Sequence, residues 1–402
     1  MWVYIIGGSL AAALAAIAFV AAEVRRAFFL NTFSRGRRWK GMLLAIAAVI
    51  IVSVITAMLL NAANMVIIFI HFSVILLLCK LAGKCIYAFA AKASGGANAE
   101  ANAETNAEAE ITANTEPNTK ANTKANTAKP ARKIFIAAAV ITVAYLAYGY
   151  YAAHHVIETR YTLDSHGREP LTIVQIADSH IGATMDGAEF SAYMAEISKM
   201  KPDLVLFTGD FADDATDPAE LEKAAEGLGK IKTKYGVFYS EGNHDRSRMP
   251  RGMSNDVSKA VTEAFEKSGV TVLADEAVNI GKDYVLLGRL DKYNESRAPI
   301  EELMEAVKNS GSGDRYSIVM DHQPSDYDAE AAAGCSLVLS GHTHGGQFIP
   351  ILRAGEILGM NDATYGHEKR GDTDFVITSG IGDWSLLFKT GCVSEYVVIE
   401  LR

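Results

Sequence analysis

The chain has 402 residues, of which 50% are hydrophobic, and its formal net charge is −9. This negative charge argues against nucleic acid as a partner, because phosphate backbones select basic surfaces. Four cysteines are too few for a disulfide framework. The length accommodates a membrane region and one soluble domain of about 245 residues, which is large enough to bury a layered core.

Long apolar runs dominate the amino-terminal part of the chain. Four of them approach or reach the roughly 20 residues that a bilayer core requires: Met1–Ala22, Gly41–Leu60, Met65–Leu81 and Ile134–Tyr151. They lack the polar stripe that helices of a soluble bundle show. We therefore predict three transmembrane helices within residues 1–93 and a fourth at residues 133–153.

Basic residues are unevenly distributed among the loops that join these spans. The loop after the first span contains Arg25, Arg26, Arg35, Arg37, Arg38 and Lys40. Because Lys and Arg favour the cytoplasmic side, we predict that this loop is cytoplasmic and that the chain after Tyr151 lies outside. No basic residue precedes the first apolar run, so we expect no cleavable signal peptide. The predicted location is the cytoplasmic membrane, with several spans.

Residues 94–132 form a low-complexity tract of Asn-Ala-Glu and Asn-Thr-Lys units, in which Ile111 is the only large apolar residue. Such a tract cannot bury enough surface to offset the entropy lost on ordering. We predict a disordered loop that acts as a spacer, with a partner-binding role as the alternative.

Residues 154–402 alternate between strand-like and helix-like segments. Short apolar runs bounded by Gly, Asp or Asn predict strands covered on both faces, at Leu171–Ala177, Leu204–Thr208, Val237–Ser240, Tyr316–Met320 and Ser336–Ser340. Helical patterns occupy Ala188–Met200, Ala219–Tyr235, Asn255–Ser268, Pro299–Asn309 and Ser325–Ala333. This alternation predicts an α/β domain.

A polar motif follows each of these predicted strands. In chain order the motifs are Asp178-Ser-His180, Gly209-Asp210, Gly242-Asn243-His244-Asp245, His322 and Gly341-His342-Thr-His344. Ligands of open α/β sheets bind at the carboxyl ends of the strands, so five loops are expected to meet in one crevice. Imidazole, carboxylate and amide groups suit Zn, Fe or Mn. Two such ions about 3.5–4 Å apart stabilise in-line displacement at phosphorus, which predicts phosphoester hydrolysis.

The series resembles the calcineurin-like metallophosphoesterases, whose pattern is D-x-H, G-D-x-x-D, G-N-H-D/E, H and G-H-x-H. Three further segments are similar to the membrane-linked bacterial branch of that family: Gly341-His-Thr-His-Gly-Gly-Gln347, Asp321-His-Gln-Pro324 and Thr378-Ser-Gly-Ile-Gly382. The resemblance implies a two-sheet β sandwich flanked by helices, with the late strands Phe375–Thr378 and Tyr396–Leu401 in the second sheet. One departure is Gly391-Cys-Val-Ser-Glu395, where we expect a Pro-rich turn.

The resemblance also implies a role for each polar residue. Asp210 would bridge both ions, one ion would take Asp178, His180 and His344, and the other would take Asn243, His322 and His342. His244 would contact the leaving group and Asp245 would orient it, so that His244, Asp245 and Asp210 are the predicted catalytic residues. Asp213 also matches the pattern, but we expect it to make a hydrogen bond beside the site.

Other candidate residues keep two interpretations each. Arg289 follows another apolar run and either binds the substrate phosphate with its planar guanidinium or forms a surface ion pair. His367 either lines the substrate edge or is simply exposed. Cys335 and Cys392 are expected to be core thiols, although an extracytoplasmic location would permit a bond between them.

We predict a membrane-anchored phosphoesterase with two divalent ions (Mn, Zn or Fe). It would hydrolyse a phosphomonoester or phosphodiester by metal-activated hydroxide on the outer side of the cytoplasmic membrane. Proximity to a membrane favours lipid or cell-wall phosphoesters as substrates, and no protein partner is predicted. A non-catalytic metal-binding interaction module on the same fold is the alternative. A third hypothesis keeps the enzyme but inverts the topology, so that it would act on cytoplasmic nucleotides or lipid precursors.

Overall fold

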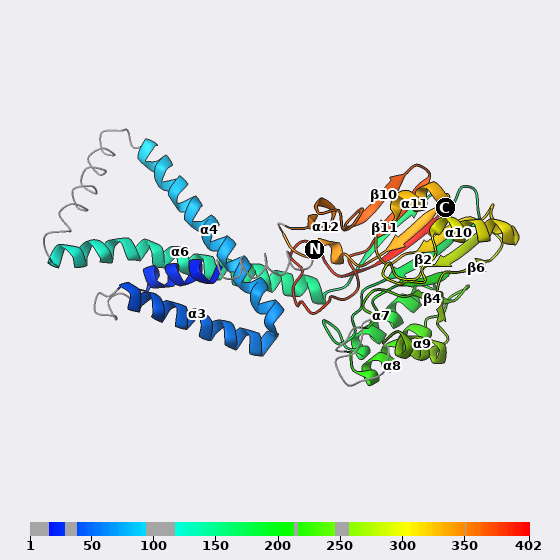
Figure 1. The fold of residues 1–402 in the computed structure, drawn as a ribbon, viewed down its shortest axis with the longest axis horizontal. Coiled ribbons are helices and arrows are strands. Elements are labelled where there is room, and N and C mark those ends of the chain that lie inside the picture. The colour runs from blue at the N-terminus through cyan, green and yellow to red at the C-terminus, as the bar shows by residue number, and fades with distance from the viewer. Residues whose placement is uncertain (1–15, 29–37, 94–116, 213–215, 246–256, 350) are drawn as a thin grey trace. The chain divides into compact units, whose positions relative to one another are not determined.

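The computed structural model describes residues 16–28, 38–93, 117–212, 216–245, 257–349 and 351–402. The chain divides into two compact units, residues 1–147 and residues 148–402. The described part of the first unit is helical, whereas the second combines strands and helices (Figure 1). The membrane-type sequence and the motif-bearing sequence therefore fold as separate units.

Long apolar helices make up most of the described first unit. They are α3 (Arg38–Leu60), α4 (Ala62–Ala93) and α6 (Pro117–His154), the last of which ends in the second unit. Stretches of these helices at Trp39–Leu60, Ala62–Ile86 and Ala131–His154 are long and apolar enough to cross a membrane. They correspond to the second, third and fourth predicted spans. Residues 16–27 are also helical, but most of the first predicted span, residues 1–15, lies outside the described residues.

Helix α6 begins earlier than the sequence predicted. Residues 117–132, assigned above to the disordered loop, are helical and continue into the span without a break. Pro117 is the first residue of the helix, a position that proline favours, and the Ala and Lys residues after it have high helix propensity. The structure thus differs from the predicted disordered loop at residues 117–132. Residues 94–116 lie outside the described residues.

The second unit contains two six-stranded mixed sheets. The first has the order β1-β12-β2-β3-β4-β5 and the second the order β10-β11-β9-β8-β7-β6. Strands of the first sheet are β1 (Ile157–Leu163), β2 (Leu171–Ile176), β3 (Leu204–Thr208), β4 (Val237–Ser240), β5 (Thr271–Val272) and β12 (Glu395–Leu401). Strands of the second are β6 (Glu276–Ile280), β7 (Tyr284–Gly288), β8 (Tyr316–Met320), β9 (Leu337–Ser340), β10 (Gly366–Arg370) and β11 (Thr373–Ile377).

Helices cover the outer face of each sheet. They are α7 (Gly187–Lys199), α8 (Pro218–Gly229), α9 (Val257–Ser268), α10 (Ile300–Val307) and α11 (Tyr327–Ala333). The described elements also include the short α12 (Ala354–Ile357), a π-helical turn at Lys308–Ser312 and a 3-10 turn at His344–Gly346. One apolar core lies between the sheets, where Ile173 and Leu206 share a cluster with Ile318. A second joins the first sheet to α7, α8 and α9, and a third joins the second sheet to α10 and α11. These layers confirm the predicted α/β fold with a two-sheet sandwich.

One late strand lies in a different sheet from the one predicted. The prediction for Phe375–Thr378 is confirmed by β11 in the second sheet, but β12 pairs with β1 and β2 in the first. The side chains of Val397 and Ile399 nevertheless point into the core between the sheets. A short apolar strand fits either inner face, so its pattern alone did not specify which sheet it joins.

Parallel pairing brings the motif-bearing strand ends together. Strands β2, β3 and β4 run parallel in the first sheet, and β8 and β9 run parallel in the second. The polar motifs directly follow these strands, so they gather at the carboxyl edge of each sheet.

Candidate metal centre

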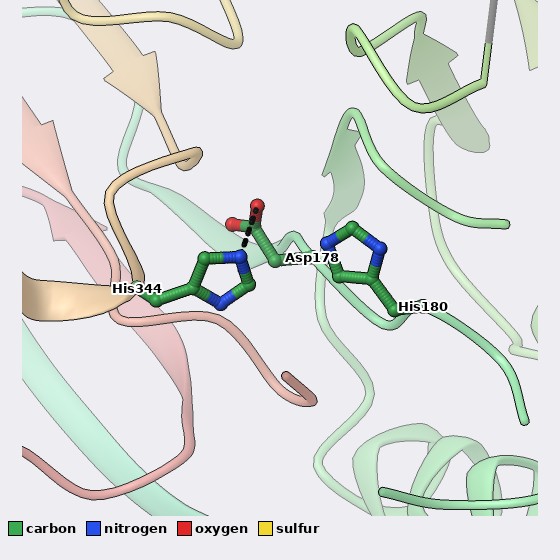
Figure 2. A group of neighbouring side chains, drawn as sticks. All are labelled: Asp178, His180 and His344. Atoms are coloured by element: carbon green, nitrogen blue, oxygen red, sulfur yellow. Dashed lines mark ion pairs between the residues drawn. The ribbon is translucent and has the colours of Figure 1, made fainter. Parts of the chain in front are cut away.

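The first group of potential ligands comes from the ends of β2 and β9. Asp178 and His180 follow β2, His344 follows β9, and ligand atoms of the three lie within 4.8 Å of one another. Figure 2 shows the Asp178 carboxylate between the two rings; its Oδ1 lies 3.8 Å from Nε2 of His344. Asp178 and His180 are fully buried. This geometry suits a single cation.

The second group lies beside the first, and one of its members, Asp210, is also close to a member of the first. Asp210 follows β3, His322 follows β8 and His342 follows β9, and their ligand atoms also lie within 4.8 Å of one another. Oδ2 of Asp210 lies 3.1 Å from Nε2 of His322 and 3.6 Å from Nε2 of His180, a member of the first group. Asp210 therefore stands between the two groups, where a bridging ligand would have to be.

The candidate ligands fit metal ions because the surrounding protein orients their nitrogen and oxygen atoms. His322 Nδ1 lies 2.8 Å from the Thr208 carbonyl oxygen and donates a hydrogen bond to it, so Nε2, on the side of Asp210, is the ring atom that would bind a metal after losing its proton. Oδ1 of Asn243 is buried and, within the described residues, has no hydrogen-bond partner. A buried polar atom left without a partner is costly and calls for an explanation such as an ion.

Backbone geometry supports the same placement. Asp178, His180, Asp210, His342 and His344 all have positive φ, between 39° and 69°. Residues other than glycine rarely adopt this conformation, which costs about 1–3 kcal/mol each and persists where the surroundings impose it, often at functional sites.

Two glycines allow the loops of the centre to approach one another. A Cβ at Gly242 would lie 2.2 Å from Oδ1 of Asp210, and a Cβ at Gly341 would lie 2.3 Å from Oδ2 of Asp178. Any side chain at either position would therefore displace a candidate ligand.

Burial sets the protonation of the metal-free centre. It lowers the pKa of His180 and of His342 to about 3, so both rings are neutral near pH 7, the form that binds metal. Burial also raises the pKa of Asp178 to about 7. Burial acts in the same direction on Asp210, but the neighbouring His322 outweighs it and holds the pKa of Asp210 below its usual range. Burial would lower the pKa of His322, but the neighbouring Asp210 carboxylate outweighs it and raises that pKa well above its usual range. The metal-free centre thus holds carboxylates, the neutral rings of His180 and His342 and a protonated His322 in a space with little water.

Asp245 does not occupy the position predicted from the resemblance. Its carboxylate accepts backbone hydrogen bonds from Asp210, Phe211, Ala212 and Gly242, at 2.7–3.0 Å. These four bonds fix the loop that carries Asp210, and none of them reaches His244. The predicted role of Asp245 in orienting the His244 ring is therefore wrong; Asp245 shapes the Asp210 loop instead.

His244 lies at the edge of the centre. Its backbone N–H donates to Oδ1 of Asp210 at 2.8 Å. Its ring contacts those of His180 and Trp384, with centroid distances of 4.9 Å and 5.3 Å. The ring is half-buried, a position from which it can meet a group bound at the metals.

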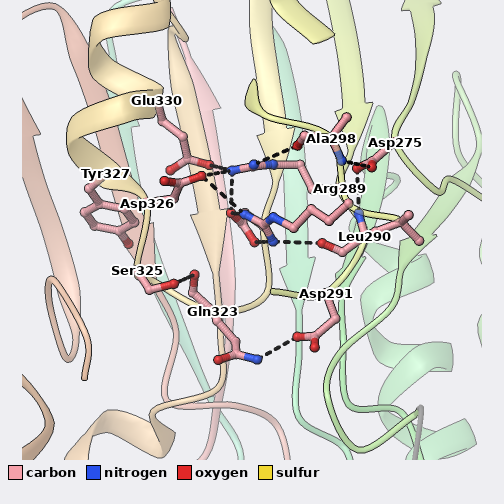
Figure 3. Close-up of polar contacts among 12 residues, drawn as sticks. Asp275, Arg289, Leu290, Asp291, Ala298, Gln323, Ser325, Asp326, Tyr327 and Glu330 are labelled. Carbon is pink, nitrogen blue, oxygen red and sulfur yellow. Dashed lines mark hydrogen bonds and ion pairs between the residues drawn. The ribbon is translucent and has the colours of Figure 1, made fainter. Parts of the chain in front are cut away.

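Arg289 is neither a surface residue nor free to bind phosphate. It is 1% exposed, and its Nη1 lies 2.9 Å from Asp321, 2.8 Å from Asp326 and 3.1 Å from Glu330 (Figure 3). Arg297 also pairs with Asp321, at 2.5 Å. Arg289 does form ion pairs, as one of the two sequence interpretations expected, but inside the protein and not at its surface. Its carboxylate partners lie after β8 and in or just before α11, far along the chain.

The remaining predicted residues lie elsewhere. His367 is on β10 and pairs with Asp374, with 2.7 Å between Nε2 and Oδ1, and among the described contacts none joins it to the metal centre. Asp213 lies outside the described residues. Cys335 and Cys392 are both free; Cys392 donates a hydrogen bond to the His344 carbonyl.

The sequence interpretation missed two residues near His344, Asp383 and Lys389. Oδ1 of Asp383 lies 3.4 Å from Nδ1 of His344, and the Asp383 carboxylate accepts from the Gln347 side chain at 2.8 Å. The buried Lys389 donates to the carbonyls of Ser379 and Gly382 and so holds the loop before Asp383. Asp383 directly follows the family-like segment that ends at Gly382, so the sequence pattern could have identified it. No pattern around Lys389 indicates its role.

Comparison with known proteins agrees with this geometry. Residues 171–346 match the family model described as calcineurin-like phosphoesterase. The chain contains a calcineurin-like phosphoesterase domain. This phosphoesterase domain includes every candidate ligand named above, whereas Asp383 and Lys389 lie beyond the matched residues.

Relatives of the chain include bacterial and vertebrate proteins. An uncharacterized metallophosphoesterase of Campylobacter jejuni is 26% identical over 241 residues, which cover 58% of this chain and 60% of the relative. A transmembrane protein with metallophosphoesterase domain from Danio rerio is 26% identical over 243 residues, which cover 58% of this chain and 53% of the relative. The chain thus spans little more than half the length of these relatives.

Among solved structures, the TT1561 protein of Thermus thermophilus is similar at a TM-score of 0.36 and 10% identity, over 54% of this chain and 91% of that one.

Proposed function

We propose that this protein is a membrane-anchored phosphoesterase that uses two divalent ions to hydrolyse a phosphomonoester or phosphodiester. The observation that carries the proposal is the position of Asp210 between two groups of buried ligands, 3.1 Å from His322 and 3.6 Å from His180. Bound in such a pair of sites, Mn, Zn or Fe would supply Lewis-acid activation of the phosphate and of a water molecule.

The protein groups around the site would each have a limited task. Asp178, His180 and His344 would hold one ion, and Asn243, His322 and His342 the other, with Asp210 shared between them. His244, half-buried beside both groups, would donate a hydrogen bond or proton to the leaving oxygen. Asp245 and Asp383 would contribute by holding Asp210 and His344 in place.

The proposed location is the outer side of the cytoplasmic membrane. The apolar stretches of α3, α4 and α6 support membrane association, and the basic residues of the first loop favour a cytoplasmic position for that loop. A reporter fused after Arg402 that is active only in the cytoplasm would test the orientation. Signal from that reporter would favour the inverted topology.

The activity is tested by hydrolysis of paired chromogenic phosphate monoester and diester substrates. The full chain in detergent would be stripped of metal and then refilled with Mn, Zn or Fe, beside the variant His342→Ala. We expect turnover that depends on metal and is lost in the variant. The preferred ester and metal follow from the same data.

The alternative function is a non-catalytic metal-binding module on the same fold. Folded, metal-loaded protein that turns over neither ester, and that also fails on lipid phosphoesters, would favour this alternative. The completeness of the ligand set speaks against it, because a module without catalysis has no need for both groups and for His244 beside them.

A further inference from the structure

A concentrated group of exposed apolar side chains follows the loop that carries His342 and His344. We name it the apolar segment; its members are Ile349, Ile351, Ile357, Leu358 and Met360. The first four are exposed by 48%, 57%, 83% and 67%. Within the described part of residues 148–402, the only other exposed large aliphatic side chain is Ile157. Single exposed apolar residues are ordinary, but a concentration of them marks a binding surface.

The apolar segment adjoins the last turns of α6. Oγ1 of Thr390 accepts a hydrogen bond from the backbone N–H of Ile349 at 3.3 Å. The methyl group of the same threonine would lie 2.8 Å from a Cβ placed on Gly149. The backbone N–H of Lys389 also donates to the Gly149 carbonyl at 2.9 Å. Since Gly149 belongs to the apolar stretch Ala131–His154, Thr390 links the segment to the end of a candidate membrane span.

Exposed aromatic residues occupy the same end of α6. Tyr148, Tyr150 and Tyr151 are about half exposed, and the Tyr150 ring packs edge-on against Phe388, which lies two residues before Thr390. Tyr and Trp gather at membrane–water interfaces because they combine an apolar ring with a polar group. These tyrosines therefore indicate the level at which α6 leaves the bilayer.

We propose that the apolar segment docks into the membrane surface from which α6 emerges, and that the metal centre acts on phosphoesters of lipids in that membrane. The second part rests on the proposed function. Ile349 follows His344 by five residues, so at most about 18 Å of extended chain separates them. Interfacial elements bury their apolar face about 5–10 Å into the headgroup boundary. A lipid phosphate at that level can meet the centre while its acyl chains stay in the bilayer.

Trp384 provides a second connection between the apolar segment and the metal centre. Its ring is 46% exposed, lies 5.3 Å from the His244 ring, and follows Asp383, which binds Gln347 just before the apolar segment. An exposed tryptophan beside the leaving-group position suits a substrate whose leaving group is apolar or enters from an interface.

Fluorescence quenching in a bilayer tests the docking surface. The full chain, with Cys79→Ser and Cys85→Ser, would carry Ile357→Cys labelled with an environment-sensitive dye and be placed in phosphatidylcholine–phosphatidylglycerol nanodiscs. Lipids that carry a quencher high on the acyl chain should quench this label. The control, Asn309→Cys, follows α10, which lies at the opposite end of the domain from α12 (Figure 1), and should not be quenched. Equal quenching at both positions, or none at either, would overturn the docking surface; so would a signal at residue 357 that depends on protein concentration, which would indicate a second copy.

Paired substrates test the lipid class. Ile357→Glu with Leu358→Glu should lower hydrolysis of bilayer phosphatidic acid or phosphatidylglycerol at least about tenfold, because two large side chains lose their apolar contact. Hydrolysis of soluble chromogenic esters should stay within about twofold, which also shows that the variant folds. The control Ala306→Glu with Asn309→Glu adds the same charges at the other end of the domain and should leave both activities unchanged.

The outcomes separate this inference from the proposed function. Parent protein that cleaves soluble esters but neither lipid would overturn the lipid class. A variant that loses both activities equally would overturn the role of the segment in delivering lipid. Parent protein inactive on every ester would contradict the proposed function, while the quenching result would still decide the docking surface.

Discussion

Two buried polar clusters lie next to each other in the phosphoesterase domain, and they differ in how their charges are balanced. In the metal centre, two carboxylates face four imidazoles, of which those of His180 and His342 are neutral near pH 7. In the cluster of Arg289, Arg297, Asp321, Asp326 and Glu330, two guanidinium groups face three carboxylates at 2.5–3.5 Å. Asp321 and His322 are consecutive, so one loop serves both.

The difference shows how a buried polar cluster that binds a ligand can be distinguished from one that only stabilises the fold. The Arg289 cluster supplies its own positive charge, so it needs no further ligand to be stable inside the protein. The candidate ligands of the metal centre include no Lys or Arg side chain, and five of them have strained backbone. The metal centre is therefore suited to a divalent cation, whereas the Arg289 cluster is not.

The largest expected effect is that of Asp210→Asn. The amide keeps an acceptor for the His244 backbone N–H but loses the charge shared between the two groups, so turnover should fall on the order of a thousandfold. Ester hydrolysis and the number of bound metal ions per chain would be measured together.

The matched control is Asp203→Asn at the opposite end of β3, where the carboxylate caps the backbone N–H of Thr172. It should leave metal content and rate unchanged. A rate in Asp210→Asn close to that of the parent, with both metals bound, would sink the bridging assignment.

Arg289→Met should act on stability rather than on substrate binding. Removing the guanidinium takes away one of the two cations that face Asp321 and the hydrogen-bond partner of Glu330, which should cost about 3–5 kcal/mol. Thermal unfolding of the metal-loaded protein would report the loss, and adding Glu330→Gln should restore part of it. If stability were kept while KM for the ester rose, Arg289 would be a phosphate-binding residue and the comparison between the clusters would break.

The sequence predicted the features that depend on local pattern. Apolar runs ending in Asp178, Asp210 or His322 specified both the strands and the polar edge, because a parallel strand must be buried on both faces and can expose polar groups only at its end. The same reasoning placed His342 and His344 correctly beside these residues.

The sequence could not predict features that depend on distant partners. Arg289 is buried by carboxylates 32 to 41 residues away, and Asp245 binds backbone groups 33 to 35 residues before it. Nothing near Arg289 or Asp245 distinguishes these pairings from a surface position or from contact with His244. Pairing of β12 likewise depends on which sheet has an open edge, not on its own residues.

Asp383→Asn should weaken metal binding without removing it. The carboxylate lies 3.4 Å from Nδ1 of His344 and holds that ring toward Asp178. Loss of such a supporting carboxylate typically lowers metal affinity tenfold to a hundredfold, or about 1.4–2.7 kcal/mol. Metal titration should show one weakened site and one unchanged site. The exposed Asp314→Asn is the control, and equal weakening of both sites would contradict the assignment of His344 to a single ion.

The smallest expected effect concerns the pH dependence of the Arg289 cluster. Burial, aided by the charge of Asp321 and opposed by Arg289, raises the pKa of Glu330 well above its usual range. The folded chain then keeps a proton that the unfolded chain releases above about pH 4.3. Because the folded state binds more protons, this group makes stability fall as pH rises beyond that value. Glu330→Gln should therefore make Tm fall less as pH rises. The free energy of unfolding of this variant should match that of the parent within about 1 kcal/mol in acid and should exceed it increasingly toward pH 8. A variant that instead loses stability as pH rises would mean that Glu330 is ionised and that its charge is needed by Arg289.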